Sequence, residues 1–160
     1  MATNYKNSTY DYISGHQTIP AAGTKTGLCI TAGTAVTGTG TKFLSEMRAG
    51  SWLVDLAHNE IRKVVRVDSD TLAYIDKAFT TSLASAAPSV IIESDTNIST
   101  ISVSILATAA AAGVVDGKTF PKGGSITFSK DSRTTSSMRD FIDPIIVDAS
   151  GTTMLVLTCK

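Results

Sequence analysis

The sequence TAVTGTGTKF at residues 34–43 decides the fold of this chain, because it bends an extended run at two closely spaced glycines. β-Branched residues lead into Gly38 and Gly40, and Phe43 follows the bend. Glycine is favoured where a side chain would crowd a neighbour or where the backbone needs a positive φ angle. We therefore expect a bent β-strand here. A phosphate-binding loop does not match, since it needs Gly-Lys-Ser/Thr or a third spaced glycine before a helix.

Short runs with alternating apolar residues continue around this bend, which is the pattern of β-strands joined by turns. A hairpin turn is expected at His58-Asn59, and Phe43–Met47 fits a single helical turn that stops before Gly50. Strands of this length and spacing are typical of a small barrel or sandwich. The expected strands are 26–31, 35–37, 52–56, 61–67, 72–75 and 89–93.

The second half of the chain has the same character after a boundary at 94–97. Asp116-Gly117 and Lys122-Gly123-Gly124 have the composition of hairpin turns. The alanine-rich stretch 107–112 forms at most one or two helical turns, or an extended segment. The expected strands are 98–105, 125–128, 145–147 and 153–158.

The fold class that these patterns predict is all-β, with two small β-barrel or sandwich units and an extended N-terminal arm. The arm covers 1–22, the first, barrel-like unit 23–94 and the second, sandwich-like unit 95–160. The arm has no regular period, and it has more apolar side chains than a solvated tail keeps. These side chains either fold back on their own domain or pack on a neighbouring subunit. The candidate interface residues are Tyr5, Tyr10, Tyr12, Ile13, Ile19 and Trp52.

The composition indicates a folded protein whose surface carries few charges. Hydrophobic residues make up 42% of the chain, charged residues only 18%, and the net charge is zero. Hydroxyl side chains replace the missing charges, with 23 Thr and 18 Ser. Such a surface, with strand edges that carry little Lys or Pro, predicts self-association into a homo-oligomer such as a trimer. The basic residues are scattered, so nucleic acid is not an expected partner.

No cluster of residues has the spacing of a catalytic or metal centre. His16 and His58 lack a second ligand at metal-binding spacing, and Cys29 and Cys159 fit packed positions in strands better than a disulfide framework or a nucleophile. We expect no catalytic residues, no metal and no cofactor. The N-terminus is polar and has no signal peptide, and the apolar stretch 101–115 is too short and too interrupted to span a membrane.

Four aspartates in the second half allow an alternative. Two carboxylates about 5 to 10 Å apart across a sugar would be a glycosidase pair, whereas Asp beside Pro, Ser or Gly is ordinary turn chemistry. The polar loop 129–140 is long for a compact domain, which is typical of functional or mobile loops, and its oxygen-rich side chains also fit calcium. We expect turns rather than catalysis at Asp131, Asp140, Asp143 and Asp148.

Four segments of the first unit resemble a pattern that recurs in structural proteins of tailed bacteriophages. They read VTGTGTKF at 36–43, GSWLV at 50–54, IRKVV at 61–65 and SDTL at 69–72, and the resemblance covers 34–92. It implies a virion structural component, located in the virion and bound to other virion proteins. The pattern occurs in both capsid-associated and tail or fibre proteins, and it brings no catalytic residues.

Within that class, the small, neutral and hydroxyl-rich chain favours a capsid-associated protein of the decoration, cement or head-fibre type. It lacks the long shaft sequence of a receptor fibre. The alternative is a tail or fibre module that binds carbohydrate on the host surface, for which Trp52 and loop 129–140 are the candidate contacts.

Overall fold

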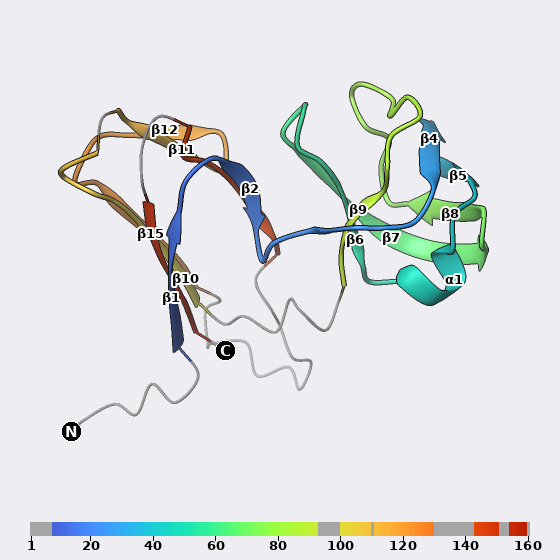
Figure 1. The fold of residues 1–160 in the computed structure, drawn as a ribbon, viewed down its shortest axis with the longest axis horizontal. Helices are drawn as coiled ribbons and strands as arrows, with labels where there is room; N and C mark the ends of the chain where they lie inside the picture. The colour runs from blue at the N-terminus through green and yellow to red at the C-terminus, as the bar shows by residue number, and fades with distance from the viewer. Residues whose placement is uncertain (1–7, 93–99, 110, 130–142, 151–153, 160) are drawn as a thin grey trace. The chain divides into compact units, whose positions relative to one another are not determined.

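A computed structural model describes residues 8–92, 100–109, 111–129, 143–150 and 154–159 (Figure 1). The described residues form strands and one short helix, so the all-β prediction is confirmed, and none of the sheets closes into a barrel. The chain divides into two compact units. The central unit is 18–95, and the terminal unit combines 1–17 with 96–160.

The central unit contains a seven-stranded sheet with the order β3-β9-β6-β7-β8-β5-β4. Every pairing in it is antiparallel. One face covers a core in which Phe43 and Leu53 are fully buried. The elements are β3 (Gly23–Thr24), β4 (Leu28–Ala32), β5 (Ala35–Thr39), α1 (Phe43–Glu46), β6 (Trp52–Asp55), β7 (Glu60–Ser69), β8 (Leu72–Ile75) and β9 (Ser89–Ile91).

The glycine bend follows the sequence prediction. A Cβ atom at Gly38 would lie 1.9 Å from Oγ1 of Thr41, and Gly40 has a φ of 64°. The space that Gly38 leaves lets the buried Thr41 hydroxyl donate a hydrogen bond of 2.5 Å to the carbonyl of Asp70. The amide of Phe43 binds the same carbonyl at 3.2 Å. The bend therefore fixes the β7–β8 turn and the start of α1.

The segment 76–88, hereafter the strap, connects β8 to β9. It lies antiparallel to β4, with amide-to-carbonyl hydrogen bonds from Cys29 to Ala86 (2.7 Å), from Ala86 to Cys29 (3.0 Å) and from Thr31 to Leu83 (3.1 Å). Farther along, β9 pairs with β3. The outer edge of β4 therefore has backbone partners in the strap, whereas β3 ends the sheet as a strand of two residues.

The terminal unit contains two four-stranded sheets, β1-β15-β10-β13 and β12-β11-β14-β2. Alternate residues of β10 are fully buried, at Ile101, Val103 and Ile105. The strands are β1 (Ser8–Ile13), β2 (His16–Ile19), β10 (Thr100–Ile105), β11 (Gly113–Val115), β12 (Lys118–Phe120), β13 (Ser125–Ser129), β14 (Ile145–Asp148) and β15 (Met154–Cys159).

The N-terminal arm folds back on its own chain, which is one of its two expected alternatives. Residues 8–13 form β1, which pairs with β15 in a continuous antiparallel register from Ser8↔Cys159 to Ile13↔Met154. β2 is the last strand of the second sheet. The sequence could not decide between the alternatives, because the partner of β1 lies at the far end of the chain, where no local pattern reveals it.

Two turns had different outcomes. Asp116 and Gly117 have φ angles of 48° and 73° and join β11 to β12, so this hairpin is confirmed. The Lys122-Gly123-Gly124 turn is not a hairpin, because it leads from β12 in one sheet to β13 in the other. No helix forms in the described part of the alanine-rich stretch, where the amide of Ala109 closes a turn on Leu106.

Candidate interaction surface

The outer side of β4 and its neighbours exposes large apolar side chains. Leu28 is 45% and Ile30 is 48% exposed, whereas Cys29 and Thr31 between them are buried. Strand register places Ile30 opposite Thr37 of β5, and Thr37 opposite Leu72 of β8. We call this uncharged surface the β4 face. Its residues are Leu28, Ile30, Ala32, Ala35, Thr37, Thr39, Leu72 and Tyr74.

The charged group beside the β4 face is already paired. Arg66 lies opposite Tyr74 in the β7–β8 register, and its guanidinium carbon lies 4.3 Å from the centre of the Tyr74 ring. Its Nε also lies 2.7 Å from Oδ1 of Asp68. Arg66 therefore covers part of an aromatic ring and has a neutralising carboxylate, so this border adds little net charge.

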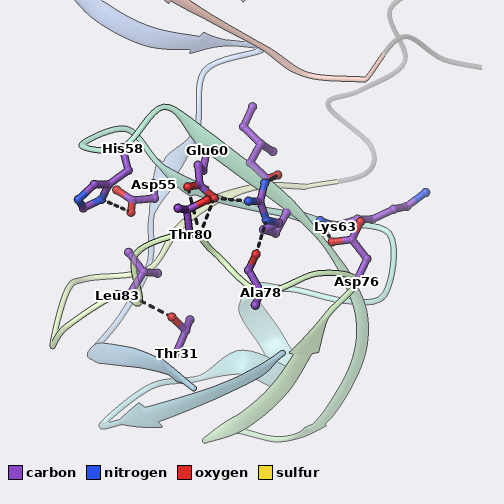
Figure 2. A network of polar contacts seen from close by, with 11 residues as sticks. Thr31, Asp55, His58, Glu60, Lys63, Asp76, Ala78, Thr80 and Leu83 are labelled. Carbon is purple, nitrogen blue, oxygen red and sulfur yellow. Dashed lines mark hydrogen bonds and ion pairs between the residues drawn. The ribbon is translucent and has the colours of Figure 1, made fainter. Parts of the chain in front are cut away.

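The strap begins in a network of polar contacts centred on Glu60 (Figure 2). The Glu60 carboxylate accepts hydrogen bonds of 3.1 and 3.0 Å from the amide of Thr80 and forms an ion pair with Arg62. Arg62 also donates to the carbonyl of Ala78 at 3.1 Å and lies over the ring of Phe79. Desolvation by burial raises the pKa of Glu60. The Thr80 hydrogen bonds and the charge of Arg62 together lower it by more than this, so the pKa of Glu60 is below its usual value.

Asp76 and Thr31 extend this anchoring (Figure 2). The carboxylate of Asp76 accepts a 2.9 Å hydrogen bond from the amide of Lys63, whose carbonyl accepts a 2.8 Å bond from the amide of Asp76. The hydroxyl of Thr31 accepts a 2.8 Å bond from the amide of Leu83. Most of these contacts bind backbone groups of the strap, so the network stabilises the position of the strap.

A second carboxylate, Asp55, organises the β6–β7 turn. It is buried and accepts a 3.1 Å bond from the amide of Ala57, while its other oxygen lies 2.7 Å from Nδ1 of His58. Asn59 completes the turn with a φ of 57°. The predicted His58-Asn59 hairpin turn is confirmed, and His58 acts there as a turn residue.

The predicted interface residues of the N-terminus differ in their exposure to solvent. Tyr5 lies outside the described residues. Tyr10 occupies a β1 position opposite Leu157, and Tyr12 is 68% exposed. Ile13 and Ile19 are 4% and 5% exposed, so the proposal that they contact a partner is wrong: the chain's own packing already covers them.

Trp52 is half-buried rather than part of the core. It starts β6, where it pairs with Lys63 and Ile91 on its two sides. The Lys63 Nζ atom lies 5.4 Å from the centre of its ring, within the range of a cation–π contact. A sugar that stacked on this face of the ring would have to displace Lys63.

The remaining chemical candidates are engaged in structure or lie outside the described residues. Asp148 accepts a 2.9 Å bond from the amide of Ser150, and hydrogen bonds from the hydroxyl and the amide of Ser150 lower the pKa of Asp148, which confirms turn chemistry there. Asp143 is exposed, and Asp131 and Asp140, with most of loop 129–140, are not described. Burial raises the pKa of the Cys29 thiol to about 11, as expected for a packed cysteine.

Two searches of the described part of the chain were negative. It holds no group of three or more His, Cys, Asp or Glu side chains arranged for a metal ion. Among the same residues, no helix has the length and apolar character needed to cross a membrane.

Comparison with protein-family models, with curated proteins and with solved structures found no match. The function is therefore inferred from the β4 face. Sequence reasoning missed the β4 face because Leu28 and Ile30 have the pattern of core residues. In the structure it is Thr31, a polar residue of the same strand, that is buried and bonded to the strap.

Proposed function

We propose that this chain is a non-enzymatic structural component of a bacteriophage virion, located in the virion. Its role is that of a capsid-associated protein of the decoration, cement or head-fibre type. It self-associates and docks on other virion proteins. The resemblance of residues 34–92 to structural proteins of tailed phages motivates the proposal, and these residues all belong to the central unit.

The single observation that carries the docking part is the β4 face. Exposed leucine and isoleucine side chains surrounded by Thr and Ala, without a charged side chain among them, suit a protein partner. Nucleic acid would require a positive patch, and this surface offers none. The strap already bonds the backbone edge of β4, so a partner meets side chains here rather than an open strand edge.

Localisation tests the proposal most directly. Antibodies against the purified chain are applied to intact particles of the phage that encodes it, and gold labels are located by electron microscopy. Labels on the heads are expected. Particles that lack the chain overturn the virion role, and labels confined to tails overturn the capsid role while supporting the tail alternative.

A matched pair of variants tests the β4 face. Ile30→Lys places a charge in the centre of the face, and we expect at least a tenfold loss of incorporation into particles. Val65→Lys adds the same charge at another exposed apolar residue, 51% exposed on β7 outside the face, and it should be incorporated normally. Equal incorporation of both variants contradicts docking through this face.

The tail or fibre module that binds carbohydrate remains the second candidate. Trp52 is its only described aromatic contact, and Lys63 lies over that ring. A glycan array with the purified chain separates the two roles. Specific glycan binding that Trp52→Ala abolishes would favour the tail module over the capsid-associated protein.

A further inference from the structure

The free edge of β13 differs from every other sheet edge in the described part of the chain. The sheets end at β1, β13, β12, β2, β3 and β4. β4 has a backbone partner in the strap and β3 is only two residues long, while β1 contains Asp11, β12 is three residues long and contains Lys118, and β2 is four residues long with Pro20 directly after it. Charges, proline and short length are the usual protections of a strand edge.

β13 itself has none of these protections, although Lys130 follows it directly in the sequence. It is five residues long, reads SITFS, pairs with β10 in an unbroken register and contains no charged residue or proline. Ile105 exchanges hydrogen bonds with the Gly123–Gly124 backbone, at 2.9 Å each. Because residues of an antiparallel strand bond alternately to either side, Ile126 and Phe128 bond towards β10. The N–H and C=O groups of Ser125, Thr127 and Ser129 therefore lie along the open edge.

The side chains of β13 are also incompletely covered. Ile126 and Phe128 lie opposite Val103 and Ile101 in the register, yet they are only half-buried, whereas their β10 partners are fully buried. The apolar layer of the sheet thus ends in two residues that another strand would cover.

We propose that β13 pairs with β13 of a second copy of this chain, antiparallel and across a two-fold axis at Thr127. In that register Ser125 meets Ser129 of the second copy, Ile126 meets Phe128 and Thr127 meets Thr127. A two-fold interface must be self-complementary, and this strand meets that condition: apolar residues face apolar ones and hydroxyls face hydroxyls. The outward N–H and C=O groups face each other, and the two four-stranded sheets become one continuous sheet.

This inference specifies the self-association within the proposed function, and its test uses the isolated chain. A five-residue edge buries less surface than a permanent dimer, so the pairing is concentration-dependent. In sedimentation equilibrium from about 1 to 500 μM, the mass should rise from 16.7 kDa towards twice that value. A single-chain mass throughout, or a trimer, overturns the two-fold pairing. Neither result affects localisation in particles, which tests the virion role separately.

Charge variants at the axis test the register. Thr127→Lys and Thr127→Glu each place like charges opposite one another, so each alone should be monomeric, with an unchanged thermal unfolding midpoint. An equimolar mixture should regain association, because Lys then faces Glu across the axis. Thr39→Lys, on the β4 face, is the control and should dimerise as the native chain does. The proposal fails if the mixture stays monomeric or if Thr39→Lys also abolishes the dimer.

Discussion

At the scale of single residues, Gly38 is a position where an added side chain would collide with a neighbouring side chain. Gly38→Ala should lower the free energy of unfolding by about 1 to 3 kcal/mol, because its Cβ must displace Thr41 and weaken the bond to Asp70. Urea unfolding followed by Trp52 fluorescence measures the change. Gly23→Ala is the control, since its nearest neighbour is the flexible end of Lys25 at 3.5 Å. Equal stability of the two variants would contradict the packing argument.

Glu60 makes the central unit sensitive to acid. Its pKa is lowered in the folded state, so its stabilisation is present above the unfolded value near 4.5 and is lost as the pH falls through the lower folded value. Glu60→Gln removes the charge at every pH. We therefore expect the native chain to be more stable than Glu60→Gln at pH 7, and the difference in urea midpoint to narrow below about pH 4.5. A difference that is constant from pH 7 to 3 would show that the ion pair contributes no pH-dependent stability.

The sequence predicts glycine and turn positions better than it predicts which strand face is buried. Gly38, Gly40 and Asp116-Gly117 follow from local backbone requirements that any fold must meet. The exposure of Leu28 and Ile30 does not follow from such local requirements. It depends on the strap, which bonds the edge of β4 and provides the buried Thr31 with a hydrogen-bond partner. The candidate surface was therefore beyond reach of the sequence pattern alone.

At the scale of elements, the strap depends on Phe79, which is buried beneath Arg62. Phe79→Ala should cost about 3 to 5 kcal/mol if the site does not collapse. It should also loosen the strap, so amide exchange should quicken at Cys29 and Thr31, whose acceptors are strap carbonyls, more than at Val64, which binds Ser51. Hydrogen-exchange NMR measures all three amides. Uniform acceleration would mean that the strap and sheet open together.

Because residues 8–13 form a strand of the terminal unit, their deletion should destabilise that unit, whereas deletion of a detachable arm would not. Deleting residues 1–13 removes β1 and leaves one edge of β15 without its partner, so the terminal unit should unfold at a lower temperature. The central unit should keep its own midpoint. Trp52, the only tryptophan, reports on the central unit, and circular dichroism reports on both. Unchanged melting of both units would restore the arm as an accessory segment.

Element boundaries were predictable where the pattern was local. The strand at 72–75 and the hairpin at His58-Asn59 have the expected positions, because alternation and turn residues lie within a few positions of each other. The pairing of β1 with β15 and the path of the strap join residues that are far apart in sequence. Neither leaves a periodic signal, so the pairing of β1 and the bonding of the β4 edge could not be predicted from the sequence.

At the scale of the whole molecule, the central unit is a continuous piece of chain and the terminal unit is not. A fragment of 18–95 should therefore fold alone, with the Trp52 fluorescence and urea midpoint of the full chain. The central unit contains the core cluster around Phe43 and Leu53 entirely within its own residues. A fragment that is unfolded at all urea concentrations would show that the terminal unit is needed to hold the central one.

The discontinuity of the terminal unit also sets an order of events on the ribosome. β1 is made first in that unit, but its partner β15 comes roughly 140 residues later, after the whole central unit. At about 5 to 20 residues per second, β1 waits roughly 7 to 28 seconds for that partner, while the central unit already has all of its strands. During this interval β1 lacks its strand partner, and an unpaired strand is prone to associate with other chains. Slow translation of any segment between β1 and β15 should thus lower the yield of native protein.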